Sequence, residues 1–411
     1  MKRRWMYVIL AMFFTVFFLY SCTSPTTTNS KEVTIVVDRT GVNRNATLIL
    51  AQDGLSGEWK ELTGTNGIYK FNVNDPDGVY SVAAVDKISN GDYNDIQLFH
   101  STLAEEKTVN IAFSPDYNTD TDFATLTVYV PTPYATANIS VFFLKHHAPN
   151  YPLEGASAAV KIPKGKGELV AIISDPDLWS PLKVYVNRNF DFPSSKPLTI
   201  ANTDLKDPGE GITGGSNGVL YSWILGKTLV PGHLNWNATI PETLINSTDK
   251  YLAEYMGWDL DWTNIFISWW KVTKDVPVTI KDGVKALSPA TTTISATAVE
   301  NNLPEITFVP YTSPISEYKT RYYNFDLSAI IGTDTYPTET HSIFITPGYL
   351  AKVENVYKFP NITLTAWKDE YKPVTDYVVQ SLGICLSPNT IDEINSLKVG
   401  TEWTIFYSYL K

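Results

Sequence analysis

The feature that most constrains this chain is a period-two alternation of apolar and polar side chains in short segments. Residues 67–73 (Gly-Ile-Tyr-Lys-Phe-Asn-Val) alternate strictly, and this pattern places one face of a strand against a core and the other in water. The turn sequence Asp75-Pro76-Asp77-Gly78 and a second strand-like segment at 79–85 follow directly. The chain also holds 24 Tyr and 18 Phe beside frequent Thr and Val, residues that favour strands. We therefore predict a mainly β protein.

The order of these strand-like segments occurs twice, with an offset of about 92 residues. Such self-similarity predicts a tandem repeat of one folding unit. We expect one small β-sandwich module at 32–115 and a second at 124–205. The strand-like segments are 33–37, 46–50, 79–85 and 108–113 in the first, and 126–130, 138–143, 168–173 and 198–201 in the second.

A short motif in the first module carries a resemblance to known proteins. The segment Asp77-Gly78-Val79-Tyr80-Ser81-Val82 resembles the G-x-Y-x-V strand of small seven-stranded sandwiches in bacterial surface proteins. These are the immunoglobulin-like, transthyretin-like and carboxypeptidase-regulatory-like modules. The resemblance implies a seven-stranded sandwich, and in those families such modules are mostly spacers or binding units.

Residues 219–411 form the largest unit and follow a Gly-rich linker at 206–218. We predict a larger β-sandwich or jelly roll with short helical insertions. One helix is expected over 249–256, ending before Gly257, and one over 390–397, capped by Asn389. The expected strands are 264–270, 342–345, 362–367 and 403–407.

The first residues have the three zones of a secretory signal. Lys2, Arg3 and Arg4 precede an apolar run over 5–20, and Ser21-Cys22 follows. The run of 16 residues is short for a membrane span, which needs about 20. We predict a signal peptide at 1–21.

Leu19, Ser21 and Cys22 resemble the lipobox of bacterial lipoproteins. The resemblance implies that Cys22 carries acyl chains, which suffice for stable membrane anchoring, and that 22–31 is a flexible Ser/Thr-rich tether. Thr23 in place of Asp favours the outer membrane, if the cell has one. The alternative is an uncleaved signal anchor in which Cys22 is incidental.

Charge and cysteine content narrow the possible partners. The formal charge of the chain is −11, and it becomes −14 without Lys2, Arg3 and Arg4. A surface this acidic argues against nucleic acid and against a polybasic membrane contact. With Cys22 acylated, Cys385 has no disulfide partner within the chain, and its apolar surroundings predict a small buried hydrophobe.

An acidic linker at 116–123 joins the two modules. Asp116, Asn118, Asp120 and Asp122 stand at every second position, which is the spacing of oxygen ligands in calcium loops. The glycine and the distal glutamate of such loops are missing. The segment is thus either a solvated linker or a calcium site, and we expect no other cofactor.

Aromatic and acidic side chains alternate near residue 260. Trp258, Asp259, Asp261 and Trp262 lie within 20 residues that also hold Tyr251, Tyr255, Trp269 and Trp270. Aromatic platforms combined with carboxylates are typical of sugar-binding faces, and two carboxylates could also serve a glycosidase. The competing interpretation is that these aromatic residues belong to a core.

No catalytic signature accompanies these features. The five histidines are scattered, and the sequence has no G-x-S-x-G elbow, phosphate-binding loop or dinucleotide fingerprint. We therefore predict a non-enzymatic, lipid-anchored surface protein whose modules present residues 219–411 to a glycan or a protein. The alternatives are a secreted carbohydrate-active enzyme with 219–411 as its catalytic part, and a structural component of the envelope.

Overall fold

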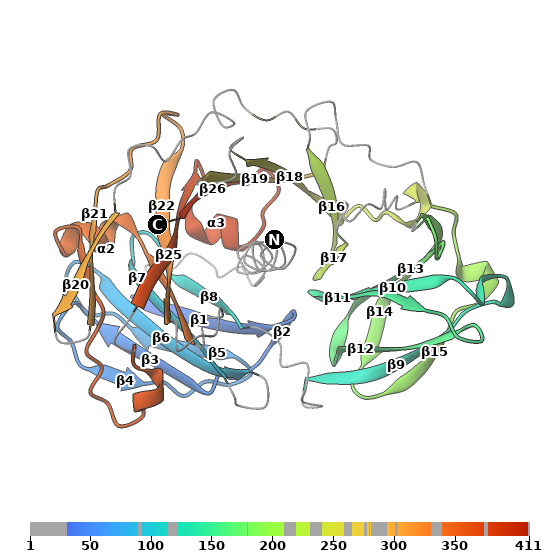
Figure 1. Ribbon diagram of the computed structural model, residues 1–411, viewed down its shortest axis with the longest axis horizontal. Helices are drawn as coiled ribbons and strands as arrows, with labels where there is room; N and C mark the ends of the chain where they lie inside the picture. The colour runs from blue at the N-terminus through green and yellow to red at the C-terminus, as the bar shows by residue number, and fades with distance from the viewer. Residues whose placement is uncertain are drawn as a thin grey trace.

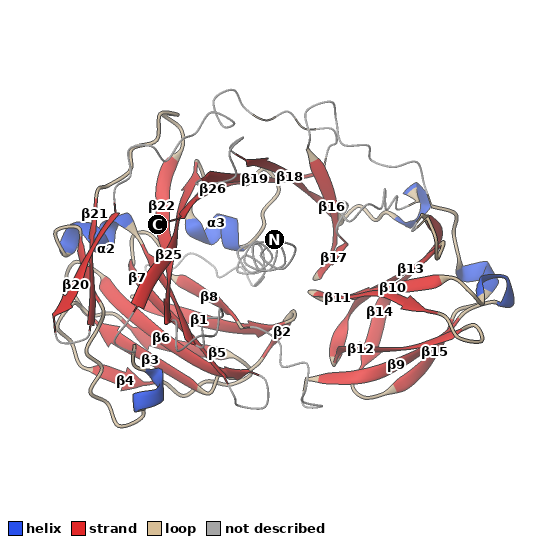
Figure 2. Cartoon of the chain, viewed as in Figure 1, coloured by secondary structure: helices blue, strands red, loops and turns tan. Residues whose placement is uncertain are grey.

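The computed structural model describes residues 31–88, 93–113, 122–178, 180–208, 219–230, 241–258, 265–274, 278, 280, 294–300, 303–329, 339–373 and 377–409. The signal peptide, Cys22 and the tether up to residue 30 lie outside the described residues. Strands dominate the part that is described (Figure 2), which confirms a mainly β protein. Its α-helices are α2 (Pro347–Lys352) and α3 (Ile391–Asn395). Short 3₁₀ turns are η2 (Thr132–Tyr134), η3 (Asn202–Asp204), η4 (Glu242–Leu244) and η6 (Asp369–Tyr371).

The first module is a sandwich of two small sheets. In one sheet, β1 pairs antiparallel with β5 and parallel with β8, and β2 closes a hairpin with β1. The other has the order β4-β3-β6-β7. The apolar side chains between the sheets, Ile35 and Tyr80 among them, form one core. The strands are β1 (Glu32–Arg39), β2 (Val42–Asn43), β3 (Leu48–Asp53), β4 (Trp59–Glu61), β5 (Ile68–Asn72), β6 (Val79–Ile88), β7 (Tyr93–Thr102) and β8 (Thr108–Ala112).

The second module repeats this topology except that it has no counterpart of β2. Its first strand, β9, pairs antiparallel with β12 and parallel with β15. The other sheet has the order β11-β10-β13-β14. The order of strand pairings in the two modules is therefore the same apart from β2. The strands are β9 (Phe123–Tyr129), β10 (Asn138–Phe143), β11 (His146–Pro152), β12 (Ser157–Pro163), β13 (Gly165–Ser174), β14 (Pro181–Phe192) and β15 (Lys196–Thr199).

Strands after residue 219 extend a sheet of the first module. β23 pairs parallel with β7, from Thr340 opposite Asp95 to Ile345 opposite His100. The described strands of this sheet run in the order β17-β16-β18-β19-β26-β25-β22-β23-β7-β6-β3-β4, and Figure 1 shows them arching from the first module to the second. The added strands are β16 (Leu220–Leu225), β17 (Thr228–Val230), β18 (Lys250–Trp258), β19 (Ile265–Thr273), β22 (Lys319–Ala329), β23 (Glu339–Ile345), β25 (Tyr377–Ser387) and β26 (Glu402–Tyr409).

A second layer covers one face of the long sheet. It consists of β20 (Ile294–Glu300), β21 (Leu303–Phe308) and β24 (Val356–Lys358), together with α2 and the segment 359–371. Phe308, Tyr357 and Trp367 pack from this layer against Leu50 of β3 and Ile343 of β23. Because β4 is the last strand of the sheet on this side, the space between the two layers opens beside β4.

Two local predictions for residues 219–411 are wrong. Residues 250–258 form strand β18, which pairs with β16 and β19. A helix was expected there, but pairing on both sides outweighs local propensity in a central strand. Residues 362–367 were expected to form a strand, but they form no ladder.

A helix near 390 and a buried Cys385 are confirmed, whereas the predicted helix cap is wrong. The helix near 390 is α3, but its cap is Thr390, which forms a capping box with Glu393, and not Asn389. The side-chain oxygen of Asn389 instead accepts the amide of Glu402 at 3.0 Å. Cys385 is fully buried without a disulfide, and burial raises the pKa of its thiol to about 12. Within the described residues, none of the helices has the length and apolar character of a membrane span.

Candidate binding groove

The predicted aromatic and acidic platform is only partly visible. Trp258 ends β18, while Asp259, Asp261 and Trp262 lie outside the described residues. Trp269 and Trp270 from the same stretch are 1% and 2% exposed, and they enter cores on opposite faces of the sheet. The core interpretation is thus confirmed for these two tryptophans.

Of the four residues predicted to bind calcium, Asp122 is described. Its buried carboxylate accepts from Arg39 at 3.1 Å and pairs with Arg44 at 2.7 Å. These arginines belong to the first module, so Asp122 ties the start of the second module to the first. Asp116, Asn118 and Asp120 lie outside the described residues.

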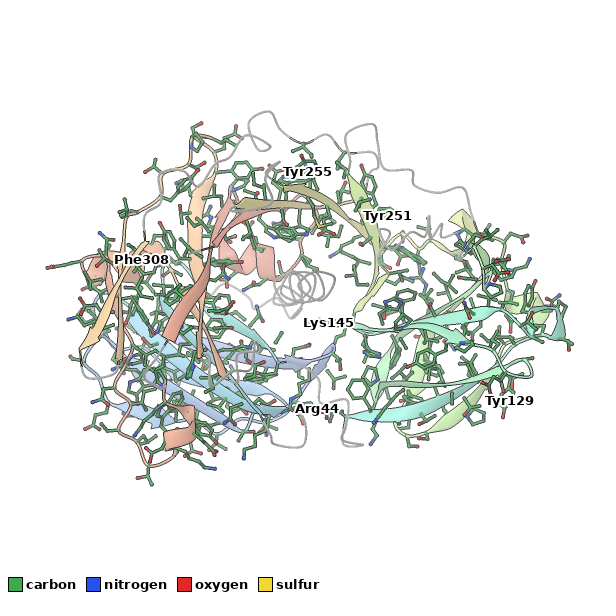
Figure 3. All side chains as sticks on the ribbon, in the orientation of Figure 1. Arg44, Tyr129, Lys145, Tyr251, Tyr255 and Phe308 are labelled. Carbon is green, nitrogen blue, oxygen red and sulfur yellow. The ribbon has the colours of Figure 1, made fainter. Side chains whose placement is uncertain are left out.

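A second ion pair lies at the same junction. Lys145, in the turn directly before β11, pairs with Asp38 of β1 at 3.2 Å, and both side chains are buried. Figure 3 shows Lys145 and Arg44 where the two modules meet. The backbone amide of Lys145 also donates to the carbonyl of Thr40 at 3.2 Å. The two modules are therefore joined at this junction by ion pairs between side chains of opposite charge.

A large hollow lies where the two layers open beside β4. This groove of about 1110 Å³ has one bank from the first module and one from the covering layer. The first bank includes Gln52 of β3 and Trp59 of β4, with Leu55 and Glu58 between them. The second bank is formed by α2, β24 and residues 360–365, and Glu305 of β21. A groove of this size has room for a molecule much larger than a single ion.

The register of the β3–β4 hairpin places Trp59 in the groove. Trp59 pairs with Gln52, so both side chains share the face from which Leu48 and Leu50 enter the core. The side chain of Gln52 donates to the carbonyl oxygen of Gly57 at 2.8 Å, which holds the connecting loop. Trp59 is half-buried and packs against the core, so one ring face is supported from below.

The opposite bank is held by Glu105 of the first module. Its carboxylate accepts the amide of Gly348 at 2.7 Å and the hydroxyl of Thr346. Both donors lie at the start of α2, where unpaired amides favour an anionic partner. The covering layer is therefore bonded to the first module next to the groove.

Two tyrosines form the floor of the groove over a buried histidine. The rings of Tyr349 and Tyr357 lie 4.9 and 5.2 Å from the ring of His100. The Nδ1 of His100 is 2.8 Å from the hydroxyl of Ser81, and burial lowers the pKa of His100 to about 3. The histidine is thus neutral near pH 7, and the floor is a packed aromatic surface.

The charges on the banks do not cancel. Lys352 pairs with Asp77 at 2.8 Å, and Lys358 pairs with Glu305 at 3.0 Å. Glu58 and Glu354, both exposed, line the groove without an ion pair in the described part of the chain. The charge left over for a ligand is therefore negative.

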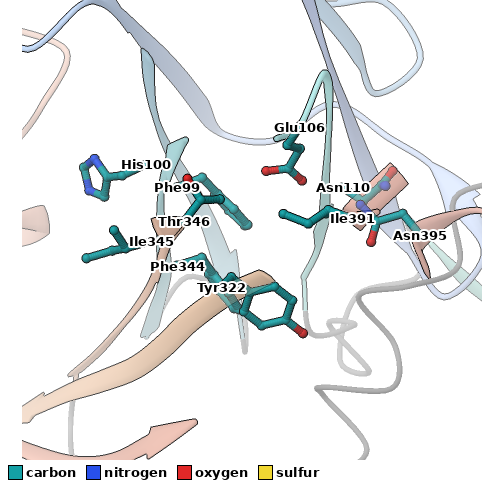
Figure 4. A pocket seen from close by; sticks show the side chains of 10 residues that line it. All are labelled: Phe99, His100, Glu106, Asn110, Tyr322, Phe344, Ile345, Thr346, Ile391 and Asn395. Carbon is teal, nitrogen blue, oxygen red and sulfur yellow. The ribbon is translucent and has the colours of Figure 1, made fainter. Parts of the chain in front are cut away.

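A second, small cavity lies between the first module and α3 (Figure 4). It measures about 40 Å³, and Phe99, Glu106, Asn110 and Asn395 are among its lining residues. One buried water needs about 10–15 Å³ of such space, so the cavity has room for very few. Asn110 is 6% exposed, and both polar atoms of its side chain lack a partner among the described residues. The lining of this cavity is mainly apolar, and the cavity is too small for a ligand of the size that the groove admits.

Comparison with known proteins adds little to this picture. No protein-family model matches the chain, and no curated protein matches it. A solved structure that it resembles is the Bacillus anthracis TIE protein, with 12% sequence identity and a TM-score of 0.17. The match covers 60% of this chain and 46% of that chain, so the chain spans less than half of the TIE protein's length. A likeness of this extent carries no assignment of function.

The groove could not be predicted from the sequence. Its banks come from residues 52–59 and 305–365, which are far apart in the chain. The available signal was Trp59 between Glu58, Lys60 and Glu61, because a tryptophan flanked by charges on a short strand is not core-like.

Proposed function

We propose that the protein is a lipid-anchored, non-enzymatic protein of the bacterial cell surface that binds its ligand in the groove beside β4. The observation that carries the binding proposal is the groove itself, at about 1110 Å³, with Trp59 on one bank and unpaired acidic side chains at its rim. Concave sites that combine an aromatic surface with a few polar groups are the usual places for ligands. The lipobox at Leu19–Cys22 supports the anchor.

This proposal moves the ligand site from the position expected from the sequence. The platform at Trp258–Trp262 was expected to contact a glycan or protein, within a C-terminal unit held out by two modules. The groove instead joins the first module to the covering layer. Both parts of the chain therefore contribute to binding.

The test is a pair of matched substitutions. Trp59→Ala should weaken binding to isolated envelope material, to a panel of polysaccharides or to extended peptides at least 10-fold, because truncating a central aromatic anchor costs about 2 kcal/mol or more. Tyr129→Ala is the control, since Tyr129 is 45% exposed on the second module, far along the chain from the groove (Figure 3). Binding is measured by sedimentation with insoluble material and by titration calorimetry with soluble probes, after thermal melts confirm that both variants fold.

Two outcomes would contradict the proposal. Equal loss of binding in both variants, or no loss in either, would show that the groove is not the binding site. Release of reducing ends from a polysaccharide would show an enzyme. The anchor is tested separately: Cys22→Ala should abolish the incorporation of labelled palmitate and release the protein from the membrane fraction.

A further inference from the structure

The edge of β4 presents free backbone groups next to the groove. The amide of Leu62 donates to the carbonyl of Ile49 at 2.9 Å. Because alternate residues of an antiparallel strand face the partner strand, Lys60 also faces β3, and the amides and carbonyls of Trp59 and Glu61 face outward. β4 is the last strand of its sheet, and neither residue has a backbone partner on that side in the described chain. These groups are available for one more strand.

The other bank contains a strand-like segment that also lacks a ladder. In residues 361–365, Asn361, Thr363 and Thr365 are exposed while Ile362 is buried and Leu364 is half-buried. This is the alternation of a strand. The backbone amides of Asn361, Thr363 and Thr365 have no partner among the described residues. Both banks of the groove therefore offer unpaired backbone to a ligand.

The corresponding edges elsewhere are protected. β7, at the other side of the first module's sheet, is covered by β23. In the second module, β11 carries Pro149 and Pro152, and β14 begins with Pro181 and is bridged by Lys206 at Val184. Proline and covering segments are the usual protection against added strands. Of these four edges, β4 is the one left open.

Hollows lie on both faces of β4. The large groove lies on the face of β4 that carries Trp59. A second hollow of about 420 Å³ lies on the opposite face and is lined by Lys60, Leu62 and Phe71. Side chains of an added strand alternate between the two faces. An extended polypeptide paired with β4 would thus place every second side chain in the groove and the others in the second hollow.

The unpaired charges select the kind of polypeptide. Glu58 and Glu354 line the groove, and Glu61 lies two residues beyond Trp59 on the same face of β4. All three are exposed and take part in no described ion pair. Lysine or arginine side chains of a ligand would complete these pairs, and a cation can also lie over the ring of Trp59.

We propose that the ligand is an extended, basic segment of a partner protein that adds to β4 as a further strand. This proposal rests on the proposed binding function and names its ligand class. Backbone pairing supplies affinity, and the acidic rim supplies the preference for basic side chains, as in other cases of strand addition.

The test uses a fluorescein-labelled peptide of nine residues in which Lys alternates with Thr or Val, read by anisotropy with the full-length protein. We expect saturable binding that weakens at least 10-fold when Glu replaces Lys. Two further peptides carry N-methyl groups on the odd or on the even amides. Because only alternate amides face β4, one of the two should bind at least 10-fold more weakly and the other should retain binding. Equal affinity of the two methylated peptides would overturn strand addition.

Protein variants locate the site. Glu61→Pro removes one outward amide of β4 and should weaken binding at least 10-fold; if this variant does not fold, the methylated peptides decide. The triple variant Glu58→Gln, Glu61→Gln and Glu354→Gln should also lose at least 10-fold, while Glu154→Gln, an exposed glutamate of the second module, should bind as the parent does. Unchanged binding in the triple variant would show that these three glutamates do not select a basic ligand.

The peptide and glycan results separate this proposal from the broader one. Binding of an oligosaccharide that depends on Trp59, without binding of the Lys peptide, would overturn strand addition and leave a groove-binding protein. Absence of any ligand that depends on Trp59 would overturn both.

Discussion

The two sandwich modules share one topology and differ in what surrounds them. Each pairs its first strand parallel with its last, and each carries a four-stranded second sheet. In the first module, β7 continues through β23 into the long sheet. In the second, the equivalent strand β14 pairs with β13 on one side. On its other side, the described chain provides only a single bridge, from Lys206 to Val184. The first module thus shares both an edge and a face of this sheet with later strands. The second shares only a face, on which Phe142 and Val170 pack in one core with Trp223 of β16.

The cores reflect this difference. The main core of the second module is built from residues 124–205, with Val42 as a contact from outside. The first module has one core of its own, but Leu50 and Leu98 face a second core shared with Tyr323 and Ile343. A duplicated fold can therefore acquire a new role when one face and one edge of a copy are covered by later strands.

The largest expected effect is on isolated fragments. Residues 122–208 should fold alone, because their main core is nearly complete and the face that they would expose, with Phe142 and Ile172, is the smaller of the two. Residues 31–113 should not, because the face with Leu50 and Leu98 would be exposed as an apolar patch. Dispersed amide signals in NMR spectra and a cooperative urea transition are the measurements. A cooperative transition for 31–113 would show that the shared core is dispensable.

The next effect is on stability. Its dependence on pH should have opposite signs for a buried group of the long sheet, Glu254, and one of the second module, His146. Burial raises the pKa of Glu254, on β18, to about 7, and it lowers the pKa of His146, on β11, to about 4. Folding favours the protonated Glu254, so its contribution is present below pH 4.5 and is lost as the pH rises through 7. Folding favours neutral His146, so its contribution is present above pH 6.5 and is lost as the pH falls through 4. Each change amounts to about 3 kcal/mol.

Substitutions isolate these two contributions. Relative to the parent, Glu254→Gln should gain stability as the pH rises from 4.5 to 8, and His146→Gln should gain stability as the pH falls from 7 to 4. Urea titrations at several pH values give both difference curves. Curves of the same sign would mean that one of the two groups is not buried as described.

The sequence predicts well those features of the structure that depend only on residues close together in the chain. The alternation at 67–73 predicted strand β5, because period-two burial is local. Residues 250–258 were misassigned because the pairing partners of β18, from Leu220 onward on one side and up to Thr273 on the other, outweigh local signals. The groove was beyond reach because it depends on the parallel pairing of β7 with β23, more than 200 residues apart.

The smallest effect concerns two turns that each have two consecutive residues at positive φ, one at the groove and one in the second module. The turn after α2 has Glu354 and Asn355 at φ 53° and 61°, and the β11–β12 turn has Gly155 and Ala156 at φ 59° and 65°. A residue other than glycine costs about 1 kcal/mol or more in this left-handed conformation. The second module places glycine at the first position, whereas the groove keeps a glutamate whose carboxylate faces the proposed ligand.

Reciprocal substitutions measure what that glutamate costs and what it contributes. Glu354→Gly should stabilise the protein by about 1 kcal/mol and weaken binding of the Lys peptide. Gly155→Glu should destabilise by a similar amount without changing peptide binding, and a side chain at Gly155 meets no atom within 4 Å, so the cost is conformational. Urea transitions and peptide anisotropy on the same samples test both. A loss of stability in Glu354→Gly would mean that the glutamate is kept for the fold, and the contrast between the two turns would then say nothing about the ligand.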